Sequence, residues 1–573
     1  MHWGTFMKRV SSFVLVLLVA GCLGGATPAP DPETDSAPRL NPLEAEGAEI
    51  IDDGLNRTFR WAGALEAGAQ PPLAGAAPGS DADTFVIPVD GSVATMTLHL
   101  DSTAPAVADL RTNASQRACG TRSGRTCTVE VPNEEPADWQ LTVTSLSPEG
   151  TSYEVRITLH PLAPTFGTDP HPLGAYTVHE ADHGGGEPTL AVLKDGRVLV
   201  VAGSDVLRLN TDGTWNDVTP PVDAAAQATL DPFLVGDRVT DRVYNTQLSQ
   251  CLRLSWTDDA GETWLTNPAA CGGPEQHHQK LAVGPGPAGR RVVHMGTMNL
   301  ASWLTTDEAV IVHSRSFDDG FAWSQNPALV REIHGMEPRA VGNIAVGDDG
   351  TVHMIAYLCD AFVDAQYNGL AVGRSTDYGA TWTWQRIGKG GGACEGIDPG
   401  LAAIGNAVHA VWWDSSDGPS RVWYAGSTDS GATWSAPSAI PTPGLHSFEL
   451  VDAAATDGRI AAAFVANVDS DKGPNQVDGW SRWYPYVATL DLTVEGASWE
   501  VVRLEAHPIQ LGPICVDGPK CMDGSRNLLD FIDVQFGPEE RVHVAYPDGC
   551  NANCTYLWQS RQAMLRVAVE DPS

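Results

Sequence analysis

A short turn motif recurs along this chain, and its repetition constrains the fold more than any other feature. The pattern Ser/Thr-x-Asp-x-Gly-x-x-Trp occurs as TDDAGETW (257–264), SFDDGFAW (316–323), STDYGATW (375–382) and STDSGATW (427–434), and NTDGTW (210–215) is a degenerate copy. The successive aspartates Asp259, Asp318, Asp377 and Asp429 are 59, 59 and 52 residues apart. A repeat of this length is typical of architectures in which each copy belongs to one structural unit.

Each residue that recurs in the copies of the motif suits a structural role. The glycine can adopt positive φ at a tight turn, the aspartate can accept backbone N–H groups that the turn leaves free, and the tryptophan can cover an apolar seam. We therefore expect the four aspartates to clamp turns rather than to act as catalytic acids.

A second repeat surrounds the first and predicts the architecture. Apolar strand, Gly/Asp-rich turn and apolar strand follow one another in seven segments: 187–202, 230–245, 278–296, 342–357, 398–413, 449–465 and 530–546. The spacing matches a four-stranded propeller blade, and the turn motifs fall in the outer half of their blades. The sequence therefore predicts an all-β chain with a seven-bladed propeller over residues 178–570, with six blades as the alternative.

A separate β domain precedes the propeller. Residues 83–89, 93–101, 139–146 and 152–160 alternate apolar and polar side chains with a period of two, between clusters of Gly, Pro, Asn and Ser. This pattern is typical of half-buried antiparallel strands. We expect a β-sandwich over residues 48–165.

The turn motif, its spacing and its all-β context resemble those of the sialidase superfamily, whose propellers carry BNR or Asp-box repeats; the resemblance covers about residues 178–570. The first domain resembles the prepeptidase C-terminal type of β-sandwich. The resemblance implies a glycan site and, in a true sialidase, three arginines, a Tyr–Glu pair and an acid–base aspartate. The Arg-Ile-Pro motif of the family is missing, because Glu187-Pro188 stands where it is expected, and no clear arginine triad exists.

Propeller geometry indicates where a site would lie, because the starts of the innermost strands converge at one mouth of the central channel. The residues at these starts, with two neighbouring arginines, are Glu187, Asp231, His278, Glu337, Arg339, Asp398, Glu449, Arg526 and Asp530. Glu187, Asp398 and Asp530 are the candidate catalytic carboxyls, and the others are candidate substrate-binding residues. The alternative is that these acidic groups satisfy backbone donors around a water-filled channel. We expect either a glycan-recognising protein, with glycoside hydrolysis as its activity if it is an enzyme, or a non-catalytic scaffold for protein partners.

Three local features bear on metals and on other chemistry. Asn467, Asp469, Asp471 and Asp478 occupy positions 1, 3, 5 and 12 of a calcium-type loop, although Lys472 stands where glycine is expected, so a solvated loop is the alternative. His277, His278, His179 and His183 lack the fixed spacing of a metal site. HGGG (183–186) resembles an esterase oxyanion loop, but the chain has no Gly-x-Ser-x-Gly elbow. No cofactor is required, and calcium is the one that the sequence suggests.

The N-terminus predicts export. Lys8 and Arg9 precede an apolar run from Val10 to Ala20, which is too short to span a bilayer, and Cys22 follows it. This arrangement is similar to a lipoprotein signal peptide (1–22) that leaves a lipid on Cys22; a plain secretory signal is the alternative. Residues 23–47, rich in Pro, Ala and acidic side chains, predict a disordered tether. We expect a monomer anchored by its lipid on the extracytoplasmic face of the cell envelope.

Cysteine count and charge limit the remaining possibilities. Apart from Cys22, ten of the 11 cysteines remain, which suits an exported chain with five disulfides, paired in order as Cys119–Cys127, Cys251–Cys271, Cys359–Cys394, Cys515–Cys521 and Cys550–Cys554. Half a zinc site is the alternative for the last pair. The net charge of −36, from 71 acidic and 35 basic residues, excludes nucleic acid and anionic lipid headgroups as expected partners.

Overall fold

The computed structural model describes the part of the chain that forms strands and their shorter connections. The described residues are 48–52, 57–65, 82–89, 93–112, 116–121, 126–132, 137–147, 151–161, 169, 171–221, 230–248, 253–267, 276–299, 309–330, 337–359, 369–389, 398–415, 418–477, 481–516, 521, 525–550 and 563–572. The predicted signal peptide, Cys22 and the tether lie outside them. Within them, no helix is long and apolar enough to cross a bilayer.

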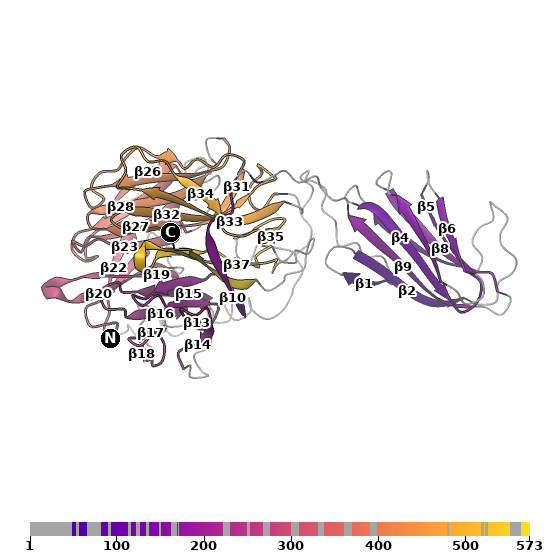
Figure 1. The fold of residues 1–573 in the computed structure, drawn as a ribbon, viewed down its shortest axis with the longest axis horizontal. Coiled ribbons are helices and arrows are strands. Elements are labelled where there is room, and N and C mark those ends of the chain that lie inside the picture. The colour runs from indigo at the N-terminus through magenta and orange to yellow at the C-terminus, as the bar shows by residue number, and fades with distance from the viewer. Residues whose placement is uncertain are drawn as a thin grey trace, which may run out of the picture. The chain divides into compact units, whose positions relative to one another are not determined.

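The first domain is a β-sandwich of two antiparallel sheets (Figure 1). One sheet has the order β1-β2-β9-β4-β7 and the other β3-β8-β5-β6. The strands are β1 (Glu49–Asp52), β2 (Arg57–Leu65), β3 (Ala82–Val89), β4 (Val93–Ser102), β5 (Ala106–Arg111), β6 (Gln116–Gly120), β7 (Cys127–Pro132), β8 (Ala137–Ser145) and β9 (Thr151–Pro161). Buried and partly exposed residues alternate along β5, as expected for a strand with one face on the core. The disulfide Cys119–Cys127, which was predicted, joins the two sheets.

The second domain is a seven-bladed β-propeller, which confirms the predicted fold and the preferred blade count. Blade 1 consists of β11 (Thr189–Val192), β12 (Val198–Ala202), β13 (Asp205–Leu209) and β14 (Trp215–Asp217). Blade 2 consists of β15 (Leu230–Gly236), β16 (Val243–Leu248), β17 (Arg253–Thr257) and β18 (Leu265–Asn267). Blade 3 consists of β19 (Gln276–Pro285), β20 (Arg291–Asn299), β21 (Ala309–Ser316) and β22 (Ser324–Val330). Blades 4 and 5 consist of β23 (Glu337–Val346), β24 (Val352–Cys359), β25 (Gly369–Ser375) and β26 (Thr383–Lys389); β27 (Gly400–Ile404), β28 (Ala407–Asp414), β29 (Arg421–Ser427) and β30 (Ser438–Ala439). Each predicted hairpin supplies the two inner strands of one blade.

The ring closes through strands from both ends of the propeller sequence. Blade 6 contains β31 (Ser447–Ala455), β32 (Arg459–Asn467), β33 (Arg482–Asp491) and β34 (Glu500–Arg503), with β35 (Gln510–Leu511) added to β33. Blade 7 contains β36 (Asp533–Phe536), β37 (Val542–Asp548), β38 (Met564–Glu570) and, as its outermost strand, β10 (Tyr176–Gly184). β10 pairs antiparallel with β38, with Tyr176 opposite Glu570. Each innermost strand contacts the next, and β36 contacts β11, so the ring is continuous.

The four repeated turns connect the third and fourth strands of blades 2 to 5 and share one hydrogen-bond pattern. In the last of them, Asp429 Oδ1 accepts bonds from the Ser427 hydroxyl and from the backbone N–H of Thr433, each at 2.8 Å. The other three turns repeat these bonds at Asp259, Asp318 and Asp377. The carboxylate therefore closes the turn, and the tryptophan that follows packs against the apolar cluster beside its blade.

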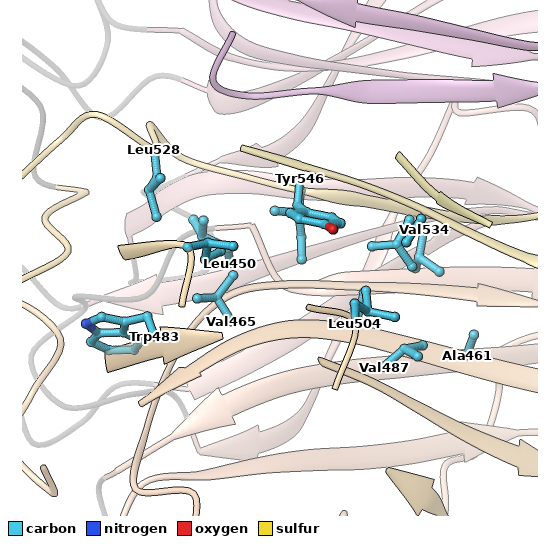
Figure 2. Packing of buried hydrophobic residues seen from close by; sticks show 14 of the residues in the cluster. Leu450, Ala461, Val465, Trp483, Val487, Leu504, Leu528, Val534 and Tyr546 are labelled. Atoms are coloured by element: carbon cyan, nitrogen blue, oxygen red, sulfur yellow. The ribbon is translucent and has the colours of Figure 1, made fainter. Parts of the chain in front are cut away.

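Apolar clusters fill the spaces between neighbouring blades. One of them lies between blades 6 and 7 and includes Leu450, Val465, Trp483, Val534 and Tyr546 (Figure 2). These side chains are almost completely buried, so the two blades share one dry interface.

Two predicted disulfides are present, and the others involve side chains that are not described. Cys515–Cys521 links the segment between β35 and β36. Cys550 is disulfide-bonded, but Cys554 lies outside the described residues. The same holds for Cys251, Cys271 and Cys394 and for the side chain of Cys359, so those two pairings stay predictions.

Candidate functional site

Four predicted carboxyls lie buried where innermost strands begin, and we call this end of the channel the mouth. Glu187 and Asp398 precede β11 and β27, Glu449 lies in β31, and Asp530 precedes β36. Their exposed fractions are 5%, 5%, 2% and 2%. Burial of four carboxyls at one end of a channel is costly unless each has a partner, so the partners decide what the mouth can do.

The backbone at the mouth adopts a conformation that side chains other than glycine rarely take. Glu187 and Asp398 have φ values of 55° and 53°, and each is followed by a proline. Leu450 and Leu529, adjacent to Glu449 and Asp530, have φ values of 52° and 61°. Each such residue costs about 1–3 kcal/mol, and residues of this kind cluster at functional sites. The surrounding fold therefore holds the mouth against local strain.

Lys280 provides the positive charge at the centre of the site. Its side chain is 1% exposed, and Nζ lies 2.8 Å from Asp398 Oδ2. The ammonium also lies 3.7 Å from the ring centroid of Phe531 and 5.0 Å from that of Phe233. Asp398 Oδ1 is buried and has no hydrogen-bond partner among the described groups. One carboxylate oxygen is therefore left to accept a bond from a ligand.

Among the predicted arginines of the mouth, the side chain of Arg526 is described, and it is paired with Asp530. Its Nη2 lies 2.6 Å from Asp530 Oδ2, and Nη1 contacts Oδ1 of the same carboxylate, which makes a bidentate pair. The pair neutralises both groups. An acidic sugar would therefore have to compete with Asp530 for Arg526.

Tyr357 shows that three carboxyls share one region. Its hydroxyl donates to the carbonyl oxygen of Trp413 at 3.0 Å. Burial raises the pKa of Tyr357 well above its usual value, and the charges of Glu449, Asp414 and Asp398 raise it further. A phenol with a raised pKa is a poor nucleophile, so Tyr357 is not an activated tyrosine.

A second acidic pair lies deeper in the channel and was not singled out from the sequence. Asp452 of β31 and Asp533 of β36 are 3% and 6% exposed. Burial raises the pKa of Asp533 to about 6, and burial together with the neighbouring Asp533 raises the pKa of Asp452 well above its usual range. Two adjacent carboxyls cannot both ionise at low cost, so we infer that the pair holds a proton.

Backbone donors from neighbouring blades bind this acidic pair. The N–H of Val534 donates to Asp452 Oδ2 at 2.9 Å, and the N–H of Leu190 donates to Asp533 Oδ2 at 2.7 Å. Asn343 Nδ2 donates to Asp452 Oδ1. The pair thus joins blades 6, 7 and 1. This is the role expected from the sequence as the alternative for the mouth carboxyls, namely to satisfy backbone donors around the channel. Its oxygens are occupied, and we assign it a structural role.

A cavity of about 330 Å³ is lined by Lys280 and Asp398 and by the acidic pair Asp452 and Asp533. It lies among the innermost strands, and its lining includes Lys280, Asp398, Phe233, Phe531 and Asn343. Volumes of this size are at the lower end of those that hold small ligands. The cavity offers an apolar surface from the two phenyl rings beside the free oxygen of Asp398.

The remaining predicted site residues are located only by their backbone. Asp231, His278, Glu337 and Arg339 lie in β15, β19 and β23, at the predicted innermost strands. Their side chains are outside the described part of the structure, as is that of His277. Their roles stay predictions.

The calcium-type loop has internal partners for two of its four expected ligands. Asn467 Oδ1 accepts the backbone N–H groups of Asp469 and Ser470, each at 2.8 Å. Asp469 forms a bidentate pair with Arg482, with Nε to Oδ2 at 2.9 Å and Nη2 to Oδ1 at 2.7 Å. Asp471 belongs to the same turn, and Asp478 lies outside the described residues. Calcium would have to displace Arg482 from Asp469. The calcium site stays a prediction.

The structure contains a tyrosine–glutamate pair, but not at the mouth. The Tyr546 hydroxyl donates to Glu505 Oε1 at 2.9 Å in the interface between blades 6 and 7. Tyr546 is completely buried, and burial and Glu505 raise its pKa well above its usual value. Because it is neither accessible nor activated, it cannot serve as a glycosidase nucleophile.

Sequence reasoning missed Lys280, Asp452 and Asp533. A signal exists for Asp452, which interrupts an otherwise apolar run in LVDAAA. Such a residue must find a buried partner. The partners, however, come from other blades and cannot be read from one strand.

Comparisons with known proteins find remote structural similarity only. No protein-family model and no curated protein matches the chain. Among solved structures, the leech intramolecular trans-sialidase is 12% identical and covers 83% of this chain and 94% of its own, with a TM-score of 0.34. The phage phi92 endosialidase is 10% identical over 70% of each chain, with a TM-score of 0.38. The Trypanosoma rangeli sialidase is 12% identical over 71% of this chain and 60% of its own, with a TM-score of 0.35. Likeness at this level carries no inference about the site.

Proposed function

We propose that this protein recognises a glycan at the mouth of the propeller channel, through a hydroxyl or amino group that donates to Asp398 Oδ1. The observation that carries the proposal is the buried oxygen of Asp398 without a partner among the described groups, next to Lys280. A buried acceptor without a partner costs about 1–3 kcal/mol, which a ligand donor would recover. Phe233, which lines the cavity and is partly exposed, offers apolar surface that a sugar ring can cover.

The charges of the mouth favour a neutral or amino sugar over an acidic one. Glu187, Asp398 and Glu449 are acidic, and Arg526 is paired with Asp530. A carboxylated sugar would meet more negative than positive charge there. We therefore propose a substrate class other than sialic acid, although the blade arrangement is sialidase-like.

The test combines binding and hydrolysis on the full chain in detergent. We expect a subset of neutral or amino glycans to bind on an array, and Asp398→Asn to weaken that binding by at least tenfold, because it replaces the charged acceptor. Fluorogenic glycosides, a sialoside among them, would show whether a bond is also broken.

Matched variants separate the site from the fold. Asp429→Asn changes a turn carboxylate outside the mouth and should bind as the wild type does. Glu187→Gln tests the mouth without leaving Lys280 unpaired. Absence of binding on the array by a folded protein, or equal binding by Asp398→Asn, would show that the proposal is wrong.

A scaffold for protein partners is the second candidate, because of a specific surface feature. Phe321 and Leu265 are 64% and 59% exposed, and Asn267 Nδ2 donates to the Phe321 carbonyl oxygen at 3.3 Å, so the two repeated turns that carry them are neighbours. This apolar rim lies at the strand ends opposite to the mouth. If array binding is absent, Phe321→Ser would test whether a partner binds there.

We also propose that the protein is exported and held at the membrane by a lipid on Cys22. The support is the sequence of the leader, with Lys8 and Arg9 before a short apolar run that ends at the cysteine. The acidic surface, with a net charge of −36, makes direct adhesion to anionic lipid unfavourable. A covalent anchor would therefore supply the membrane affinity.

A further inference from the structure

A cluster of metal-ligating side chains lies outside the mouth, where the segment after β34 meets blade 7. It consists of Glu505, His507 and Asp548, each of which can offer one ligand atom within 4.8 Å of the others. The side chain of Asp548 is completely buried, that of Glu505 is 9% exposed, and that of His507 is 27% exposed. The two carboxylates are therefore shielded from solvent, and the histidine is partly exposed to it.

The hydrogen bonds around the cluster divide the carboxylate oxygens into two sets. Tyr546 donates to Glu505 Oε1 at 2.9 Å, and the backbone N–H of Cys550 donates to Asp548 Oδ1 at 2.9 Å. The other oxygens face the imidazole, with Glu505 Oε2 3.5 Å from His507 Nδ1 and Asp548 Oδ2 3.0 Å from His507 Nε2. Outer partners that orient carboxylates in this way are typical of metal sites.

The distances are close to those of a coordination shell. Zinc binds nitrogen and oxygen at about 2.0–2.2 Å, so tetrahedral ligands lie about 3.3 Å from one another. The histidine can use only one of its nitrogens for a given metal, and a rotation of its side chain would bring that nitrogen between the two carboxylates.

The charges of the region also leave room for a cation. Arg566 is the guanidinium that serves three carboxylates, at 2.7 Å from Asp548, 3.7 Å from Glu505 and 3.0 Å from Glu180. These described contacts set three carboxylates around one guanidinium, a negative environment that favours a divalent ion. Arg566 approaches Asp548 Oδ2 itself, so it would become an outer partner of the bound carboxylate.

We propose that Glu505, His507 and Asp548 form a binding site for a zinc-type divalent cation. One nitrogen and two carboxylate oxygens suit zinc better than calcium, which takes oxygen ligands. The ion would join the segment after blade 6 to β37 of blade 7, the blade that closes the ring. Its expected role is structural.

The experiment uses the full, untagged chain after treatment with EDTA. Calorimetric titration with Zn²⁺ should give one ion per chain, with weaker binding of Ca²⁺, and saturation should raise the melting temperature. His507→Gln and Glu505→Gln should each weaken Zn²⁺ binding by at least tenfold. His446→Gln changes an exposed histidine elsewhere and should leave the binding unchanged.

Cobalt provides a spectroscopic check that does not depend on stability. Co²⁺ should give visible d–d absorption in the wild type and not in His507→Gln. If no stoichiometric Zn²⁺ binds, or if both variants bind it as the wild type does, the proposal is wrong. In that event a proton on His507 would supply the missing positive charge.

Discussion

At the scale of single residues, the channel shows how one carboxyl pair can serve the fold rather than chemistry. Asp452 and Asp533 accept backbone N–H groups from the next blade, as Thr189 does when its hydroxyl accepts the N–H of Leu234 at 2.8 Å. An aspartate offers two oxygens, so it can bind a neighbouring blade and a second donor at once. The cost is that two negative charges approach each other unless a proton is bound.

This pair predicts a pH dependence of stability with a defined sign. The pKa of Asp533 is raised from 3.8 to about 6 and that of Asp452 is raised further, so the folded state binds more protons than the unfolded chain. The resulting stability is fully present below about pH 4 and is lost as the pH rises through 6 and above. A shift of about two pKa units corresponds to about 3 kcal/mol in the free energy of unfolding.

Asp452→Asn tests this prediction, because an amide imitates the protonated acid. The free energy of unfolding of the wild type, relative to that of the variant, should fall between pH 4 and pH 8. Urea unfolding followed by tryptophan fluorescence measures it. Asp429→Asn is the control, since the pKa of Asp429 is lowered to about 2 by hydrogen bonds from Thr433 and Ser427, and it stays ionised over this range. A constant difference for Asp452→Asn would contradict the shared proton.

At the scale of elements, the repeated turn joins neighbouring blades as well as closing itself. A Cβ added to Gly379 would lie 2.0 Å from the ring of His313, which belongs to the preceding blade. The glycines of the other turns approach the preceding blade in the same way, at Val218, Leu254 and His353. The motif glycine is therefore required both for its φ and for this contact.

Gly379→Ala should accordingly cost more than an equivalent change at an open turn. Gly379 has a φ of 85° and no room for a methyl group, whereas Gly405 has a φ of 55° and nothing within 4 Å of an added Cβ. We expect Gly379→Ala to lower the free energy of unfolding by about 3 kcal/mol and Gly405→Ala by about 1 kcal/mol. Chemical denaturation of both variants compares them directly. Equal costs would mean that φ alone matters at the turn.

At the scale of the whole molecule, closure of the ring depends on strands far apart in the sequence. β10 and β38 pair across blade 7, so the start and the end of the propeller sequence are held by one sheet. Asp452, Asp533 and the apolar cluster between blades 6 and 7 add to this junction. The proposed zinc site adds a link between the segment after blade 6 and β37 of blade 7.

The proposed anchor predicts the distribution of the protein in the cell. Wild-type protein should partition with membranes and carry a covalent lipid detectable by mass spectrometry. Cys22→Ser should remove the lipid and release the protein into the soluble fraction, because a single lipid-modified residue is the proposed source of membrane affinity. Cys515→Ser, at a cysteine in a disulfide, is the control and should stay with the membrane. Membrane association of unlipidated Cys22→Ser would contradict the proposal.

The repeated turn, the seven hairpins and the alternation of the first domain predicted the all-β class and the propeller from sequence alone, with seven blades preferred over six. Such features are local, since each turn is closed by its own Asp, Gly and Trp, and each hairpin by strands next to each other in the chain. The mouth could also be located, because the starts of innermost strands converge in any propeller. Glu187, Asp398, Glu449 and Asp530 were therefore expected there.

Only the tertiary structure decided what these residues do. Lys280 and Asp398 are 118 positions apart, and Asp452 and Asn343 are 109 positions apart, so no local pattern predicts their contacts. The state of a buried charge depends on all the groups around it, which several blades supply. Glu505, His507 and Asp548 meet for the same reason: the cluster exists only once the last blade has closed the ring.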